Sequence, residues 1–154
     1  MKKTAALLCA LLLAVGAVSL AACGGSGAEG NTDAQEQTLT GTATLTWHGN
    51  LEFLAVVDVA LEGDVIQSVT VREGSFITTD AFSGWEPNRE AYLEQYVGLT
   101  VADITEMKAL PPDDVNDHYD GGSIEGAVSV VTGASASSTV IAMAVKNAIE
   151  QYQG

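Results

Sequence analysis

Hydrophobic and polar positions alternate through the first half of the chain in a way that predicts β-strands. From Thr38 to Trp47, threonines alternate with small or apolar residues, which suits one strand. Apolar side chains then dominate residues 52–62 and 64–73, with Glu62-Gly63-Asp64 between the two runs. A glycine beside acidic residues favours a tight turn, so these runs predict an antiparallel hairpin.

The second half of the chain changes to helical spacing. Residues 88–97 carry apolar side chains three and four positions apart, and Asn88 stands where a helix N-cap belongs. Residues 100–107 predict a second short helix, which Pro111-Pro112 would end. The side chains expected to face inward from it are Val101, Ile104 and Met107. The acidic, turn-rich residues 111–123 are expected to be exposed.

The last segment has the clearest helical pattern. One face of it carries Val140, Ile141, Ala144, Val145, Ala148, Ile149 and Tyr152. Its start would be capped by Ser137, Ser138 or Thr139. Strands first and an apolar helix face last predict an α+β fold, a small antiparallel sheet with a C-terminal amphipathic helix packed on it.

The beginning of the chain is typical of an exported protein. Lys2 and Lys3 precede an apolar run, as in a secretory signal peptide, and a retained membrane helix is the alternative. The run ends in Leu20-Ala21-Ala22-Cys23, which resembles the lipobox of bacterial lipoproteins, where the thiol receives a diacylglycerol. An ordinary signal peptide with a chance cysteine is a further alternative. We therefore expect a signal peptide over residues 1–22, a flexible tether over 23–37 and a folded domain over 38–154. The lipid on Cys23 would hold the domain at the cell membrane, facing outside the cytoplasm.

Charge and cysteine content narrow the classes of partner and site. Removal of residues 1–22 leaves four basic residues against 20 acidic residues, a net charge of −16. Such a charge repels nucleic acid and anionic lipid headgroups. Cys9 leaves with the signal peptide and Cys23 carries lipid, so we expect no disulfide. His48 and His118 lack the partner spacing of a metal site, and we expect none.

The segment before the last helix has the composition of an anion site. Its sequence is Val130-Val131-Thr132-Gly133-Ala134-Ser135-Ala136-Ser137-Ser138. Gly133 and Ala134 let a ligand approach the backbone, and the N–H groups and partial positive charge of a helix N-terminus favour an anion. A bound phosphate group is one interpretation, and a plain serine-rich N-cap is the other.

The same residues, Thr132-Gly133-Ala134-Ser135-x-Ser137-Ser138, resemble the S/T-G-A-T/S-x-T/S-S motif of the FMN-binding domain family. That family includes the flavin-carrying subunits of Rnf-type and sodium-pumping quinone reductase complexes, and many small exported lipoproteins. The likeness extends over about residues 40–152. It implies that a flavin transferase, using FAD and Mg²⁺, joins FMN through its phosphate to the hydroxyl of Ser135. It also implies that Thr132, Gly133 and Ala134 form the preceding turn, and that Ser137 and Ser138 contact phosphate or cap the helix.

The resemblance implies an electron carrier more than an independent enzyme, with a membrane redox complex or an extracytoplasmic reductase as partner. Ser129 stands where modified members of the family usually have Asp. Covalent FMN, non-covalent FMN and a flavin-free interaction module on a membrane redox complex therefore all remain open. Trp85 lies on a loop, where it could stack on the isoalloxazine ring or close over the core.

Overall fold

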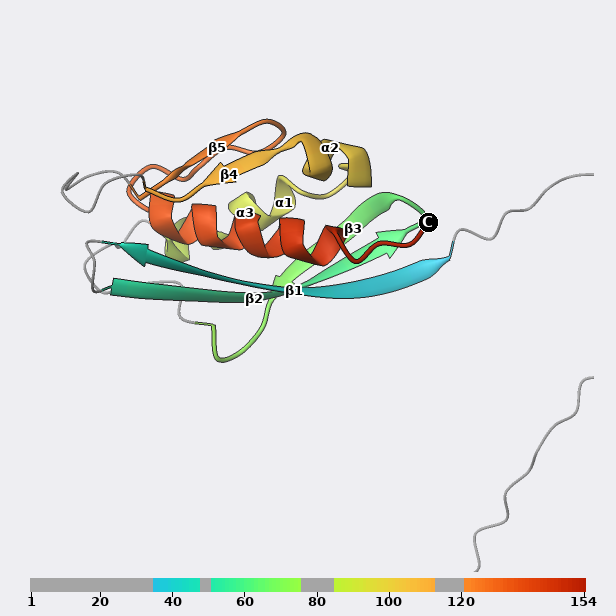
Figure 1. Cartoon of the computed structure of the whole chain (residues 1–154), viewed down its shortest axis with the longest axis horizontal. Helices are drawn as coiled ribbons and strands as arrows, with labels where there is room; N and C mark the ends of the chain where they lie inside the picture. The colour runs from blue at the N-terminus through green and yellow to red at the C-terminus, as the bar shows by residue number, and fades with distance from the viewer. Residues whose placement is uncertain (1–34, 48–50, 76–84, 113–120) are drawn as a thin grey trace, which may run out of the picture. The chain divides into compact units, whose positions relative to one another are not determined.

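A three-stranded antiparallel sheet forms the base of the fold in the computed structural model, which describes residues 35–47, 51–75, 85–112 and 121–154. The strands β1 (Glu36–Trp47), β2 (Leu51–Glu62) and β3 (Val65–Val71) lie in that order, with β2 central (Figure 1). Gly63 in the β2–β3 turn has φ of 60°, a left-handed conformation that favours glycine. The predicted first strand and hairpin are confirmed.

One face of this sheet builds the core. Along β1 the buried positions are Leu39, Gly41, Ala43, Leu45 and Trp47, and along β2 they are Phe53, Ala55, Val57, Val59 and Leu61. Successive side chains of a strand point to opposite faces, so the intervening threonines of β1 lie on the other face. The alternation seen in the sequence is therefore the alternation between core and outer face.

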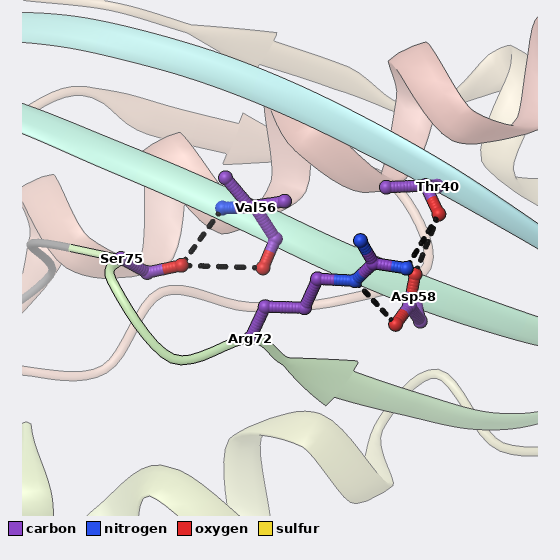
Figure 2. A network of polar contacts seen from close by, with 5 residues as sticks. All are labelled: Thr40, Val56, Asp58, Arg72 and Ser75. Carbon is purple, nitrogen blue, oxygen red and sulfur yellow. Dashed lines mark hydrogen bonds and ion pairs between the residues drawn. The ribbon is translucent and has the colours of Figure 1, made fainter.

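The outer face carries the threonines of β1 and is hydrogen-bonded across its strands (Figure 2). The Thr40 hydroxyl donates to Asp58 Oδ1 at 2.6 Å, and Arg72 Nε donates to Asp58 Oδ2 at 2.6 Å. The hydrogen bond from Arg72, followed by that from Thr40, holds the pKa of Asp58 below its ordinary value. Beyond β3, the Ser75 hydroxyl accepts a hydrogen bond from Val56 N and donates one to Val56 O. These two bonds hold the segment after β3 against the backbone of β2.

Helix α3 (Ser135–Ile149) packs on the inner face of β1 and β2 and runs antiparallel to β1. Asn147 Nδ2 donates to Thr42 O at 2.8 Å, and one turn later Gln151 Nε2 donates to Thr40 O at 2.9 Å. Because β1 is an edge strand, these two amides also cover part of an edge that would otherwise offer unpaired carbonyls.

Gly41 permits the closest approach between α3 and β1. A Cβ atom built on Gly41 would overlap the carbonyl oxygen of Ala144 and lie 2.6 Å from Ala148 N and 2.9 Å from Ala148 Cβ. A glycine inside a strand often marks a place where another backbone comes close. Here the inward-facing glycine meets two alanines of the helix, so the two backbones pack without side chains between them.

A second layer covers the opposite side of α3 (Figure 1). It consists of α2 (Val101–Glu106) and an antiparallel pair of short strands, β4 (Lys108–Leu110) and β5 (Ser123–Glu125). Helix α1 (Arg89–Glu94), which follows the 3-10 turn η1 (Glu86–Asn88), lies against β3. The predicted α+β fold with a terminal helix on the sheet is therefore confirmed.

The burial of α3 exceeds the prediction. Six of the seven predicted inward side chains are buried and Tyr152 is half-buried, but Thr139 and Ala142, which the prediction left out, are also buried. The helix lies between two layers, so little of its surface reaches solvent.

The start of α3 differs from the prediction. The helix begins at Ser135 with Ala134 as its N-cap, so Ser137, Ser138 and Thr139 lie inside its first two turns. The prediction that one of these three residues caps the helix is wrong. A serine-rich run offers several possible N-caps, and tertiary packing selects among them.

The two short helices follow the prediction with local corrections. Asn88 is the N-cap residue of α1, but its side chain makes no capping hydrogen bond. Thr100 caps α2 through a reciprocal pair of hydrogen bonds with Asp103. Helix α2 ends at Glu106 and β4 follows, so Pro111-Pro112 does not end it.

The expected signal peptide, most of the expected tether including Cys23, and both histidines lie outside the described residues. The expected end of the tether at residue 37 is wrong, because Glu36 and Gln37 already pair with β2 as the first residues of β1. All residues that are described belong to one compact unit, Asp33–Gly154. Among them, no helix has both the length and the apolar character needed to cross a bilayer.

Candidate functional site

The turn formed by Thr132 and Gly133 leads directly into α3. Gly133 has φ of 79°, and Ala134 N donates to Val131 O at 2.9 Å, which closes the turn. Thr132 and Gly133 are exposed, and a Cβ atom built on Gly133 would meet nothing within 4 Å. The backbone of this turn is therefore open to a ligand from outside.

Ser135 is the first residue of α3, and its side chain is half-buried. The first N–H groups of an α-helix have no acceptor within the helix, and they carry its partial positive charge. No acidic residue lies in the first turn of α3 to neutralise that charge. The Ser135 hydroxyl thus lies at a position that favours an anionic group.

Ser138 fixes the turn to the helix. Its fully buried hydroxyl accepts from Val131 N at 3.0 Å and donates to Ala134 O at 2.9 Å. Both hydrogen bonds are internal to the segment, so this side chain stabilises the turn. Ala134 and Ser137 are also buried, which leaves Thr132, Gly133 and Ser135 as the members of the predicted set that reach the surface.

Two glycines pack against the first two turns of α3. A Cβ atom built on Gly121 would overlap the Ser135 hydroxyl and lie 2.5 Å from Ala136 N, and one on Gly122 would lie 2.9 Å from the Thr139 hydroxyl. Both glycines are buried, so the prediction that residues 111–123 are exposed is wrong at these positions. Any side chain here would push the segment away from the helix start.

A pocket of about 310 Å³ lies between the turn and α1. It is lined by Asn88, Ala91, Tyr92, Gln95, Val131 and Thr132. Its volume is at the lower end of the range for small-molecule sites, and its lining is about equally polar and apolar, which is more polar than is usual for such sites. Thr132 belongs to both the turn and the pocket, so the two form one continuous candidate site.

Gln95 bonds α1 to the segment before the turn. Its side-chain oxygen accepts from Ser129 N at 2.9 Å, and its amide nitrogen is 3.5 Å from Ser129 O. The backbone of Ser129 is therefore fixed by these contacts, although the residue as a whole is exposed to solvent. The width of the pocket is set by this contact, because α1 and the turn form its opposite walls.

A buried aromatic cluster lies beneath the pocket. The Tyr92 hydroxyl donates to Ser138 O at 2.7 Å and lies 2.8 Å from the Tyr96 hydroxyl. Burial raises the pKa of Tyr92 and of Tyr96, so both are neutral hydrogen-bonding groups. Trp85 is 2% exposed and packs edge-on against Tyr92 with ring centroids 5.7 Å apart. Trp85 therefore closes over the core, and the aromatic residue of the pocket is Tyr92.

Sequence reasoning identified the turn but missed the groups that complete the site. Gly121-Gly122 could have been noticed as a pair of adjacent glycines, which often marks close backbone packing. The contribution of Asn88 and Gln95 to the pocket could not be predicted, because polar residues at the ends of a short helix usually face solvent.

No group of three histidine, cysteine, aspartate or glutamate side chains suited to a metal ion occurs within the described ranges. No protein-family model, no curated protein and no solved structure matches this chain. The resemblance to FMN-binding domains therefore stays a prediction from the motif at residues 132–138.

Proposed function

We propose that this chain is an extracytoplasmic lipoprotein that carries FMN, joined through its phosphate to Ser135, and that it transfers electrons. The observation that carries the proposal is the arrangement at the start of α3. The Ser135 hydroxyl, the open turn at Thr132-Gly133 and the pocket beside Thr132 follow one another along one surface. Bound flavin would supply the redox chemistry, and the protein would supply position and electrostatics.

The start of α3 suits the phosphate end of FMN. In the attachment step, the Ser135 oxygen bonds to the FMN phosphorus of FAD on a flavin transferase. The phosphoanhydride bond breaks, AMP leaves, and the hydroxyl proton passes to a base or to water. The phosphodiester that remains is an anion, which the N–H groups at a helix N-terminus favour. Thr132 is exposed beside it and offers a further hydroxyl donor.

The pocket beside Thr132 would take the isoalloxazine ring of FMN. Asn88 and Gln95 bring amide groups and Val131 brings apolar surface, while Tyr92 lies fully buried beneath them. A planar ring there would be held on one side and open to solvent on the other, which suits an electron carrier. The same groups would serve FMN that binds without a covalent bond.

A flavin-free interaction module is the second candidate. The observation in its favour is Ser129, which stands where modified family members usually have Asp. In that case the turn and the pocket would contact a partner protein, and Ser135 would remain unmodified.

Two serine variants test the attachment. The mature protein, Ser135→Ala and Ser123→Ala are each produced with a secreted flavin transferase, denatured and examined for flavin fluorescence on a gel. Ser123 is an exposed serine on β5 and is the matched control. We expect fluorescence in the wild type and in Ser123→Ala, and none in Ser135→Ala.

The remaining outcomes separate the candidates. Flavin retained by denatured Ser135→Ala would show that another residue is modified. Native protein whose yellow colour is lost on denaturation would indicate non-covalent FMN. A colourless wild type would favour the interaction module.

A further inference from the structure

The two edges of the three-stranded sheet are protected to different extents. On the β3 side, Ile66 N donates to Leu99 O and Gly98 N donates to Ile66 O, each at 2.8 Å. β3 is also short, and its pairing with β2 contains a register shift. β1, at the opposite edge, has 12 residues in one unbroken register with β2. Proteins usually shorten, bend, charge or cover an exposed edge strand, and this protein does so more fully at β3 than at β1.

The backbone groups on the outer edge of β1 belong to its threonines. Thr40 O and Thr42 O point away from β2, since they accept hydrogen bonds from α3. In an antiparallel ladder, successive residues alternate between bonding to the partner strand and pointing away from it. Thr44 and Thr46 therefore also direct their N–H and C=O groups outward, and both residues are exposed. These outward groups have no hydrogen-bond partner among the described residues.

Helix α3 covers only part of this edge. The two side-chain amides that bond Thr40 O and Thr42 O are four residues apart on α3, while the threonines are two residues apart on β1. One further step of the same size, from Asn147 toward the helix start, places Met143 beside Thr44. Met143 is half-buried, and its side chain has no N–H group to donate. The series of covering amides therefore ends at Thr42.

The exposed part of the edge is uncharged in a strongly acidic chain. Residues 37–47 contain no charged side chain, whereas the chain without residues 1–22 has a net charge of −16. Two copies repel each other wherever acidic surfaces meet, so the threonine edge favours their approach. An antiparallel pair centred on Thr44 would place Thr44 opposite its own copy and Thr42 opposite Thr46, with about six main-chain hydrogen bonds and no like charges opposed.

We propose that the edge of β1 at residues 42–46 is a homodimer interface, at which two copies of this chain join their sheets into one sheet of six strands, three from each copy. The interface is symmetric, so each copy contributes the same residues. None of these residues belongs to the candidate site at the start of α3. The dimer therefore holds or fails independently of the proposed FMN function.

Sedimentation of residues 33–154 tests whether the chain self-associates. These residues form one compact unit and contain every buried hydrophobic residue of the described core. At moderate salt, which screens the negative charge, we expect the mean mass to rise from one copy toward two between about 10 µM and 1 mM. A strand edge can also bind an extended segment of a different protein. In that case this chain alone would stay monomeric over the whole range, and the proposal would be overturned.

Thr44→Pro tests the position of the interface. The change removes one outward N–H from each copy and leaves the bonds between β1 and β2 intact, because that N–H does not face β2. Each dimer loses two hydrogen bonds, so we expect the dissociation constant to rise by about tenfold or more. The matched control, Thr44→Ala, keeps the N–H and should change the constant by less than about threefold.

Met143→Gln tests the same position without a proline. Its amide can bond Thr44 O, as Gln151 bonds Thr40 O, and we expect the dissociation constant to rise by about threefold or more. Far-UV circular dichroism checks that each variant is folded, and Met143→Gln decides if the proline variant is not. Folded variants that dimerise as tightly as the wild type would place the interface elsewhere.

Thr44→Cys tests the symmetry of the dimer. Residues 33–154 contain no cysteine, so the variant has a single thiol. A hydrogen-bonded antiparallel pair has Cα atoms about 5.5 Å apart, within the range of a disulfide. Under mild oxidation we expect a covalent dimer from Thr44→Cys and little from Thr70→Cys, an exposed threonine on the outer face of β3. Equal cross-linking of the two variants, or none in either, would contradict a pair centred on Thr44.

Discussion

Individual hydroxyl groups have different roles within the serine-rich segment. Ser135 is half-buried at the start of α3, whereas Ser138 is fully buried and bonded within the turn. From the sequence alone, Ser135 and Ser138 were both predicted to contact the ligand, because the sequence does not reveal at which residue a serine-rich helix begins. Once the helix starts at Ser135, residue 138 lies one turn inside it and its hydroxyl meets Ala134 O.

The Ser138→Ala variant tests this structural role. The change leaves Val131 N without its side-chain acceptor, so we expect the free energy of unfolding to fall by about 1–2 kcal/mol. Ser129→Ala, at an exposed serine nearby, should change it by less than about 0.5 kcal/mol. Urea titration measures both. Equal effects of the two variants would show that the Ser138 hydroxyl does not fix the turn.

Asp58 makes a pH-dependent contribution to stability. Hydrogen bonds from Arg72 and Thr40 lower the pKa of the folded carboxyl below its unfolded value. The ionised form therefore adds stability above about pH 4, and this contribution is lost as pH falls through the folded pKa. We expect Asp58→Asn to be less stable than wild type at pH 7 and the difference to shrink towards pH 3. Urea titration across this range measures it, and a difference that stays constant would contradict the assignment.

At the scale of elements, the strands and the hairpin were predictable because alternation and a glycine turn are local signals. The second layer over α3 was not, because β4 and β5 have three residues each, too few for an alternating pattern to stand out in the sequence. The helix face was predicted from its spacing, but its burial on both sides depends on that layer. The pocket was also beyond prediction, since it joins α1 to a turn about 40 residues later.

The contact between α3 and β1 predicts a strong effect at Gly41. Gly41→Ala places a methyl group where the backbone of α3 lies, so we expect a loss of more than about 2 kcal/mol in unfolding free energy. The matched control is Thr44→Ala, at an exposed position on the outer face of the same strand. Thermal or urea unfolding compares them. Similar stability of the two variants would mean that helix and strand do not meet closely at Gly41.

At the scale of the whole molecule, the order of elements brings the motif to one end of the fold and the start of β1 to the other. The sequence predicted an exported domain and a phosphate-binding turn, and both stay predictions; the α+β architecture places Thr132 and Gly133 directly before a buried helix. The sequence did not reveal that Ser135 and the start of β1 lie at opposite ends of the domain, because that arrangement depends on the direction of α3 across β1.

The intact mass of the mature protein, produced with a flavin transferase and analysed after denaturation, tests the central claim most directly. The account predicts a mass increased by one FMN less one water, in addition to the lipid on Cys23, and peptide fragmentation that places the flavin on Ser135. A chain that carries lipid but no flavin, with Ser135 unmodified, would contradict covalent attachment. If the native protein also bound no FMN, the redox role would be contradicted as well.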